Sequence, residues 1–453
     1  MAYAFVGLFL ALIGYMVYFQ AVRSREIVRS PYNARQDSFA ENVIRGNIVA
    51  SGGEVLAKTE VGEGGAESRV YPYGSLFAHV VGFASNGKSG LESTENFTLL
   101  TSNAFFIEKF KNEIKDRKNY GDTVVTTLNV NLQKVASNAL GNYKGAVIVL
   151  EPSTGKILAM VSKPDFDPNT ISSIWDSIKD DENGNLLNRA TQGQYAPGST
   201  FKIVTALEYM RENPNYSDYR YTCTGEIGVG DVVIHCYGNR VHGEEDLASS
   251  FANSCNTSFS NIGVQLNVKS FQETAKELLF GEKLPGDVPY VTSKFQLTES
   301  SSDAEKMMTA MGQGLTQVSP YHLALITCAI ANGGVLMKPY LVDKVTNYTG
   351  SEINKTKPKK YAELMTSGEA FALKELMRGV VENGTASTLK GRSYTAAGKT
   401  GTAEYSSDKE KDHSWFVGIR NVDNPDLVIA VIIEGSDGTA RAVNVAKEVF
   451  DNY

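Results

Sequence analysis

The chain is organised around the stretch APGSTFK, residues 196–202. Its proline and glycine interrupt any preceding element, and the run STFKIVTALEYMREN predicts a helix that begins at Ser199 and ends before Pro214. Backbone N–H groups at a helix start have no partner within the helix. Lys202 lies three residues after Ser199, so its amine is expected on the same face as the hydroxyl. A neutral amine can take the hydroxyl proton, so the pair predicts a serine nucleophile with an adjacent oxyanion site.

A single Ser-x-x-Lys is weak evidence, because the chain contains such motifs at Ser85, Ser153, Ser199, Ser387 and Ser406. Most matches of this kind are solvated turns or helix faces. The copy at Ser153 lies on a predicted hairpin turn, LEPSTGKILAM, and illustrates that interpretation. Two further motifs distinguish Ser199 from the other four.

The second motif is Ser254-Cys255-Asn256, the only Ser-x-Asn in the sequence, which interrupts a helical run. Its functional interpretation is a loop in a cleft, where Asn256 orients Lys202 and a substrate amide. Ser254 would relay a proton to the leaving group. A helix cap is the simpler alternative, because serine and asparagine commonly cap helices.

The third motif is Lys399-Thr400-Gly401-Thr402, at the start of a predicted strand, AAGKTGTAEY. Lys399 supplies positive charge for an anionic substrate terminus, and the hydroxyls of Thr400 and Thr402 can bind its carboxylate. Gly401 lacks a side chain where an edge strand must receive an extended peptide. A nucleotide-binding phosphate loop is disfavoured, because it requires glycine where the chain has Ser393.

Composition restricts the classes of function. The chain has 453 residues, of which 42% are hydrophobic and 21% charged, which suits two or three globular domains. Its net charge of −7 argues against nucleic acid as a partner. The cysteines show no metal-ligand spacing and the histidines include no HExxH pair, so we predict no metal. We also predict no cofactor. Cys223 and Cys236 flank a hairpin-like segment and form either a disulfide or two buried thiols, whereas Cys255 and Cys328 are interpreted as packing residues.

The N-terminal residues 1–22 carry no charged side chain, and about 20 apolar residues of helix span a bilayer. No basic region precedes this run and no cleavage site follows it, so we predict an uncleaved transmembrane anchor. The flanking Arg23, Arg25 and Arg29 favour a cytoplasmic main body by charge alone.

Three segments follow from the patterns of apolar residues and turns. Residues 1–22 are the anchor, residues 23–143 form a mixed module for spacing or docking, and residues 144–453 form the largest domain. That domain contains a hairpin, helices, a helical insert, antiparallel strands and a closing helix. We therefore predict an α+β fold.

The order Ser-x-x-Lys, Ser-x-Asn, Lys-Thr-Gly is the motif set of serine β-lactamases and penicillin-binding proteins. More narrowly, the chain resembles a class B penicillin-binding protein, a monofunctional D,D-transpeptidase of peptidoglycan synthesis. RGNIVASGGEVLA resembles the opening of the family's pedestal, with Ala50-Ser51 replacing an Asp-Arg pair. Further blocks that resemble the family are GAVIVLEPSTGKILAMVSKPDFDPN, NRATQGQYAPGSTFKI, MGQGLTQVSPYHLALITCAIANGG, VENGTAS and HSWFVG.

This resemblance implies a pedestal over residues 23–143 and, over residues 144–453, a transpeptidase domain with an antiparallel sheet, flanking helices and a helical subdomain. It implies that Ser199 attacks stem peptides ending in D-Ala-D-Ala, that Lys202 is the base, and that the N–H groups of Ser199 and Thr402 hold the oxyanion. Ser254, Asn256 and Lys399 would complete the catalytic set, with Thr400, Gly401 and Thr402 binding substrate. β-Lactams would acylate the same serine.

The resemblance further implies a single-pass protein of the cell membrane with an extracytoplasmic catalytic domain. It implies a partner among the membrane glycosyltransferases of the shape, elongation and division family. Two alternatives remain open. One is a D,D-carboxypeptidase or serine β-lactamase, in which water takes the acyl group. The other is a non-enzymatic β-lactam sensor that uses the same pocket.

Overall fold

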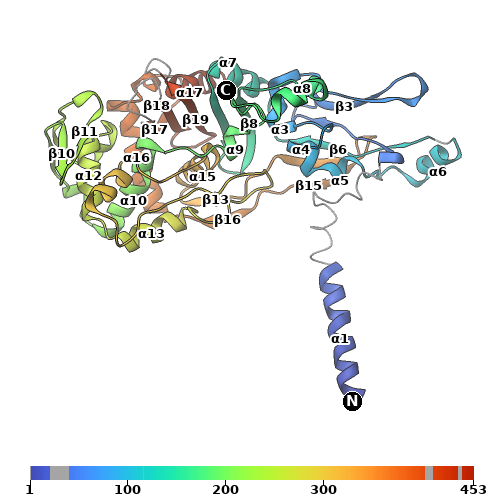
Figure 1. Ribbon diagram of the computed structural model, residues 1–453, viewed down its shortest axis with the longest axis horizontal. Coiled ribbons are helices and arrows are strands. Elements are labelled where there is room, and N and C mark those ends of the chain that lie inside the picture. The colour runs from blue at the N-terminus through green and yellow to red at the C-terminus, as the bar shows by residue number, and fades with distance from the viewer. Residues whose placement is uncertain (1, 21–39, 116, 404–411, 437–440) are drawn as a thin grey trace. The chain divides into compact units, whose positions relative to one another are not determined.

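The computed structural model describes residues 2–20, 40–115, 117–403, 412–436 and 441–453 (Figure 1). The chain forms two compact units. Unit 1 comprises Met1–Thr126, Asp167–Trp175 and Val342–Thr356; unit 2 comprises Thr127–Phe166, Asp176–Leu341 and Lys357–Tyr453. The limits predicted for the pedestal and the transpeptidase domain, residues 23–143 and 144–453, stay predictions.

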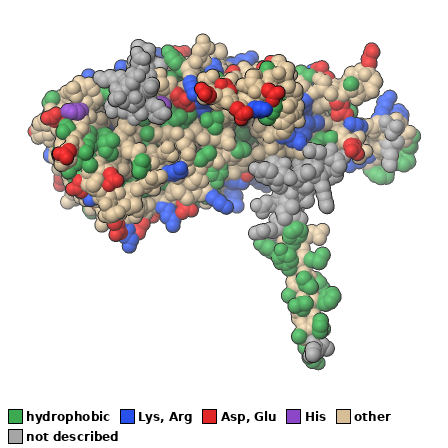
Figure 2. Space-filling model, viewed as in Figure 1, with side chains coloured by type: hydrophobic (Ala, Val, Ile, Leu, Met, Phe, Trp, Pro, Cys, Tyr) green, Lys and Arg blue, Asp and Glu red, His purple; other side chains and the backbone are tan. Residues whose placement is uncertain are grey.

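Helix α1 begins unit 1 and spans Ala2–Tyr18, and exposed hydrophobic side chains cover it (Figure 2). Within the residues that the structure describes, no helix has both the length and the apolar character needed to cross a membrane. The anchor predicted over residues 1–22 therefore stays a prediction. The three flanking arginines lie outside the described residues.

A six-stranded sheet in the order β15-β14-β6-β2-β3-β4 forms the centre of unit 1. Its strands are β2 (Ile48–Val49), β3 (Val55–Val61), β4 (Glu67–Val70), β6 (Thr123–Thr126), β14 (Val342–Thr346) and β15 (Glu352–Lys355). Strands β2 and β3 form an antiparallel pair on either side of Gly52-Gly53. Separately, β1 (Val43–Ile44) pairs in parallel with β5 (Asn119–Tyr120). Besides α1, this unit contains the helices η3 (Glu63–Gly65), η4 (Gly74–Phe77), α3 (Ala78–Val81), α4 (Gly90–Thr94), α5 (Asn96–Leu99), α6 (Phe106–Ile114) and η5 (Pro168–Thr170).

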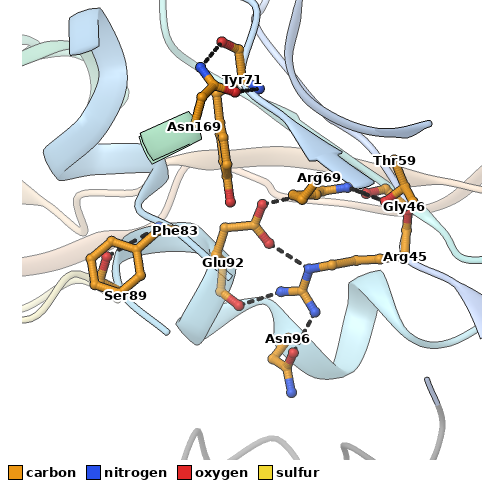
Figure 3. Close-up of polar contacts among 10 residues, drawn as sticks. All are labelled: Arg45, Gly46, Thr59, Arg69, Tyr71, Phe83, Ser89, Glu92, Asn96 and Asn169. Atoms are coloured by element: carbon orange, nitrogen blue, oxygen red, sulfur yellow. Dashed lines mark hydrogen bonds and ion pairs between the residues drawn. The ribbon is translucent and has the colours of Figure 1, made fainter. Parts of the chain in front are cut away.

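A buried ion-pair network stabilises unit 1 around Glu92, whose side chain is fully buried (Figure 3). Arg45 donates to Glu92 over 2.5 Å and to Asn96 over 2.5 Å, and Arg69 donates to Glu92 over 2.7 Å. Burial alone would raise the pKa of Glu92, but the two guanidinium groups outweigh it and keep the pKa below its ordinary value. Arg69 also donates to the carbonyl oxygen of Gly46 over 2.7 Å. The Arg-Gly pair that opens the pedestal motif thus has a structural role here.

The core of unit 2 is a five-stranded antiparallel sheet in the order β17-β18-β19-β7-β8. Its strands are β7 (Gly145–Glu151), β8 (Lys156–Lys163), β17 (Ala396–Ala403), β18 (Asp412–Arg420) and β19 (Leu427–Ser436). Strands β7 and β19 read as continuous apolar runs, GAVIVLE and LVIAVIIEGS, because they are buried on both faces. Helices α7 (Val130–Leu140) and α17 (Ala442–Asp451) pack against each other and the sheet, and α9 (Arg189–Gln192) and α15 (Pro320–Ala331) also pack on it.

Most of the remaining helices of unit 2 lie between β8 and β17 in the sequence. They are η6 (Gly198–Phe201), α10 (Lys202–Glu212), η7 (Tyr216–Asp218), η8 (Tyr237–Asn239), α11 (Leu247–Ala252), α12 (Asn256–Gln265), α13 (Val268–Glu277), α14 (Asp303–Ala310), α16 (Ser367–Asn383) and η9 (Ser387–Leu389). Helix α8 spans Ile171–Ile178. The predicted α+β class is confirmed for the chain's folded units.

Short antiparallel pairs accompany these helices. They are β9 (Tyr221–Cys223) with β12 (Gly243–Glu245), β10 (Glu226–Val229) with β11 (Val232–His235), and β13 (Val335–Met337) with β16 (Lys360–Glu363). Strands β10 and β11 lie next to α12 in Figure 1, and α12 contacts β9, β10 and β11. They therefore border the loop that carries the second motif.

Candidate active site

The predicted nucleophile, Ser199, lies in the tight turn η6, which continues directly into α10. Its side chain is partly exposed. Two hydrogen bonds from distant segments hold the turn. The N–H of Gly198 donates to the carbonyl oxygen of Gly312 over 2.9 Å, and Nε1 of Trp415 donates to that of Ala196 over 3.0 Å. The position of the serine is therefore set by long-range contacts as well as by its own helix.

Close backbone packing brings this turn against the third motif. Gly198 has a positive φ of 52°, and a β-carbon there would lie 2.5 Å from the carbonyl oxygen of Thr402. Gly312 has φ of 90°, and a β-carbon there would lie 1.8 Å from the carbonyl oxygen of Gly198. Only glycine permits these approaches. The backbone of Thr402 thus adjoins the segment that carries Ser199, as an oxyanion site shared by the two residues requires.

Lys202 is fully buried at the first position of α10. Its Nζ donates to the carbonyl oxygen of Ser254 over 2.7 Å and to Oδ1 of Asn256 over 2.8 Å, and it lies 3.4 Å from Oγ of Ser254. Burial lowers the pKa of Lys202 to about 8, because a charged amine is poorly solvated there. Part of the amine is therefore neutral near neutral pH, as a general base requires.

Lys399 reaches the same hydroxyl from the sheet. Its Nζ donates to Oγ of Ser254 over 2.9 Å and to the carbonyl oxygen of Thr400 over 3.2 Å. The side chain is fully buried, and burial together with the charge of Lys202 holds its pKa well below the ordinary value. Oγ of Ser254 therefore lies between two buried amines, which gives it a route for passing a proton.

The Ser254 loop has a strained backbone. Ser254 has φ of 57°, in the left-handed region that is uncommon for residues other than glycine. Asn256 donates through Nδ2 to the carbonyl oxygen of His235 over 3.0 Å. The cap of α12 is Cys255, whose Sγ accepts from the N–H of Ser258. The helix-cap alternative therefore does not account for Ser254 and Asn256, which instead contact the lysines.

The third motif lies on β17, at the edge of the five-stranded sheet. Side chains alternate along it: Lys399 and Gly401 are buried, whereas Thr400 is half-buried and Thr402 is exposed. Thr385 was missed by the sequence analysis, although the block VENGTAS contains it. Its hydroxyl hydrogen-bonds to that of Thr400, and its N–H donates to the carbonyl oxygen of Ala252 over 3.2 Å. It thus connects β17 with the end of α11.

The structure thus joins Lys202, Ser254, Asn256 and Lys399 by direct hydrogen bonds. It differs from expectation at one contact. Among the described residues, no hydrogen bond joins the Ser199 hydroxyl to Lys202, whose amine points to the Ser254 loop instead. Catalytic hydrogen bonds often form fully only when substrate is bound.

The four cysteines are free thiols in the structure. The disulfide alternative for Cys223 and Cys236 is thus not observed, and their Sγ atoms lie 3.7 Å apart. Cys255 lies 3.7 Å from Cys236, so that three of the four thiols meet beside the Ser254 loop. Their spacing in the sequence did not reveal this, because β9, the end of β11 and the start of α12 contribute one each.

Two family models match the chain. The penicillin binding protein transpeptidase domain matches residues 145–453, and the penicillin binding protein A dimerisation domain matches residues 45–124. The peptidoglycan D,D-transpeptidase PbpA of Mycolicibacterium smegmatis is 32% identical over 426 residues, covering 88% of this chain and 84% of the relative. The protein of the same name from Mycobacterium tuberculosis is 31% identical over 440 residues, covering 90% and 88%.

Solved structures agree. The imipenem acyl-enzyme complex of penicillin-binding protein A from M. tuberculosis has a TM-score of 0.82 at 28% identity, covering 91% of this chain and 98% of that chain. The D,D-transpeptidase domain of a peptidoglycan glycosyltransferase from Eggerthella lenta has a TM-score of 0.82 at 30% identity, covering 91% and 98%. The chain therefore belongs to the penicillin-binding protein family, as a class B peptidoglycan D,D-transpeptidase. The resemblance inferred from the motifs is confirmed.

Proposed function

We propose that the chain crosslinks peptidoglycan stem peptides through an acyl-enzyme on Ser199, with Lys202 as the general base. The observation that carries this proposal is the position of Ser254, whose Oγ lies 3.4 Å from Nζ of Lys202 and 2.9 Å from Nζ of Lys399. Two buried amines on one hydroxyl form a proton path that starts next to the nucleophile's helix. A purely structural serine has no need of both amines.

In the acylation step, Oγ of Ser199 attacks the carbonyl carbon of the penultimate D-alanine while neutral Lys202 accepts the hydroxyl proton. The N–H groups of Ser199 and Thr402 hold the resulting oxyanion. The C–N bond then breaks, and Ser254 relays the proton held by Lys202 to the amine of the departing D-alanine. In the second step an acceptor amine attacks the ester carbonyl, the bond between that carbon and Oγ of Ser199 breaks, and the proton lost by the amine passes to Oγ of Ser199. The new amide forms the crosslink.

Strand β17 is proposed to receive the donor peptide. It is an edge strand, so an extended peptide can add to it through backbone hydrogen bonds. Thr400 and Thr402 place their hydroxyls on one face, while Lys399 lies beneath with its charge directed inward. Hydroxyl donors above a buried amine suit the carboxylate that ends a stem peptide. Gly401 faces the opposite, buried side of the strand, where a β-carbon would lie 3.0 Å from Cγ2 of Thr200, so its glycine permits close packing against the turn that carries Ser199.

β-Lactams are proposed to acylate Ser199 as analogues of the D-Ala-D-Ala terminus. Solved M. tuberculosis relatives hold acyl-enzymes with imipenem and with penicillin G. Glu245, a buried carboxylate near the loop, is engaged by Ser250 over 3.2 Å and Asn253 over 2.8 Å. It is therefore held as a structural acceptor, and we expect a long-lived adduct. Rapid turnover of nitrocefin would instead favour the β-lactamase or carboxypeptidase alternative.

We also propose a single-pass anchor in the cell membrane over residues 1–22, with the catalytic unit on the extracytoplasmic side. The support is chemical: residues 1–22 carry no charged side chain, and the acceptor and donor peptides are joined outside the cytoplasm. A membrane glycosyltransferase of the shape, elongation and division family is the proposed partner. Its glycan product would supply the strands that this site crosslinks.

The test is labelling of the full chain with fluorescent penicillin, comparing Ser199→Ala with a matched control, Ser153→Ala. Ser153 starts another Ser-x-x-Lys, and it is exposed at the turn between β7 and β8. We expect one covalent adduct in the parent and in Ser153→Ala and none in Ser199→Ala. An adduct that persists in a folded Ser199→Ala protein would remove Ser199 from the nucleophile's role.

A further inference from the structure

Four side chains that can bind a metal converge beside the Ser254 loop: Cys223, Cys236, His242 and Cys255. Sγ of Cys236 lies 3.7 Å from Sγ of Cys223 and 3.7 Å from Sγ of Cys255, and Nδ1 of His242 lies 3.4 Å from Sγ of Cys223. The four ligand atoms all lie within 4.8 Å of one another. The three thiols are buried, and the imidazole is half-buried.

These separations match a tetrahedral zinc site. Zinc binds sulfur at about 2.3 Å and histidine nitrogen at about 2.0–2.1 Å, so tetrahedral ligands lie about 3.8 Å apart for two sulfurs and about 3.5 Å apart for sulfur and nitrogen. A disulfide would bring two sulfurs to about 2.05 Å and leave the third thiol alone. Thiolate and imidazole ligands in this geometry select Zn²⁺ over Mg²⁺ or Ca²⁺.

The surroundings of the sulfurs support ligation over simple packing. Oγ1 of Thr257 lies 3.2 Å from Sγ of Cys223 and 3.3 Å from Sγ of Cys255. The N–H of Ser258 donates to Sγ of Cys255 over 3.4 Å. Packed apolar thiols need neither an imidazole nor these donors, whereas metal-bound thiolates are stabilised by such hydrogen bonds.

The segment that supplies three of the ligands has little core of its own. Strands β10 and β11 are largely exposed, and Ile234 is the one buried residue on the pair. Ile234 packs with Met307 and Met311 in a small cluster, and a two-stranded hairpin with so small a core is marginally stable in water. Cys223 ends β9, Cys236 follows β11 and His242 precedes β12, so a shared ion would hold these strand ends together.

We propose that Cys223, Cys236, His242 and Cys255 bind one Zn²⁺ ion in a closed tetrahedral site that fixes the catalytic loop. Binding releases the three thiol protons, and the four protein ligands leave no open position for substrate. The ion therefore has a structural role. Cys255 stands between Ser254 and Asn256, both of which contact Lys202, so loss of the ion displaces the base's partners. This effect on catalysis rests on the proposed function, whereas metal binding does not.

Metal content of the full chain, purified in detergent without chelator, tests the site directly. We expect one zinc per chain by mass spectrometry of the metal. Cys223→Ser and His242→Ala should lose most of it, to below about 0.2 zinc per chain, whereas His242→Cys should keep it through a four-cysteine site. The matched control is Cys328→Ser, a buried free thiol in α15 outside the cluster. Parent protein without zinc, or zinc retained in a Cys223→Ser/His242→Ala double variant, overturns the proposal.

If the variants fail to fold, the site can still be tested in the parent chain by replacing the bound metal with Co²⁺ and recording its absorption spectrum. Tetrahedral thiolate ligation should give intense visible bands and sulfur-to-metal charge-transfer bands; a spectrum of an octahedral aquo ion overturns the proposal. Chelation should also slow acylation by fluorescent penicillin about tenfold, with recovery on adding Zn²⁺ and none with Mg²⁺. Unchanged acylation after complete zinc removal overturns the loop-fixing part. Labelling of Ser199→Ala tests the nucleophile separately. A failure of the proposed function can therefore be told apart from a failure of the proposed zinc site.

Discussion

At the scale of single residues, the proposed mechanism requires a neutral amine at Lys202. Burial lowers the pKa of Lys202 to about 8. The neutral fraction of such an amine rises about tenfold between about pH 7 and about pH 9, because deprotonation is nearly complete one unit above the pKa. We therefore expect the second-order rate constant for acylation to rise about tenfold over this range. Labelling rates in a pH series measure it, and a flat profile would argue against Lys202 as the base.

A second residue-scale prediction concerns Gly312, whose β-carbon would lie 1.8 Å from the carbonyl oxygen of Gly198. Gly312→Ala should displace the nucleophile's turn and slow acylation at least about a hundredfold, since small misplacements of reacting groups are costly. Gly314→Ala is the matched control: its φ is also positive, but the nearest atom, Oγ1 of Thr309, lies 3.7 Å away. That variant should lose about 1–2 kcal/mol of stability and keep its acylation rate. Equal rates in both variants would refute the steric argument.

The three motifs could be predicted because each lies within a few consecutive residues, whose types and spacing indicate their chemistry. Gly312 and Thr385 could not be singled out in this way. Their importance arises from contacts with residues far along the chain, Gly198 and Thr400, which no local pattern records. The grouping of His242 with three cysteines was not predicted for the same reason, because these residues meet only after two hairpins have folded.

At the scale of elements, β17 depends on a neighbour for its geometry. The Thr385 hydroxyl hydrogen-bonds to that of Thr400 and so fixes the rotamer of a proposed carboxylate ligand. Thr385→Val should reduce acylation efficiency about tenfold, which corresponds to about 1.4 kcal/mol for one lost polar contact, while Thr385→Ser retains it. Thr388→Val, at an exposed position in η9, serves as control. If Thr388→Val lowered the rate constant as much as Thr385→Val does, the loss would reflect a general structural effect and not the hydrogen bond to Thr400.

The element types follow from local patterns, but their arrangement does not. The β7–β8 hairpin and the apolar strand β19 are readable from continuous hydrophobic runs. The sheet order places β19 between β18 and β7, so that strands from opposite ends of unit 2 are neighbours. Such pairing is decided by the burial of apolar faces in three dimensions. The tight first turn at Ser199 likewise follows from the long-range bonds to Gly312 and Trp415.

At the scale of the whole molecule, two arguments about orientation in the membrane disagree: the charges beside the apolar segment favour one side, and the location of the substrates favours the other. Arg23, Arg25 and Arg29 follow the apolar segment and favour a cytoplasmic main body. Large domains are translocated largely regardless of such charges, and a transpeptidase needs substrates that lie outside. We therefore expect alkaline phosphatase fused after Tyr453 to be active, because that reporter folds outside the cytoplasm.

Replacing the three arginines with glutamine should leave reporter activity within about twofold, since the long domain, and not the local charge, determines its final side. A fluorescent protein that folds only in the cytoplasm, fused at the same position, is the complementary control and should stay dark. Reversed signals from the two reporters would place the catalytic unit in the cytoplasm. Ser199 would then have no access to assembled peptidoglycan, and a crosslinking role would be untenable even if β-lactams still acylated the purified protein.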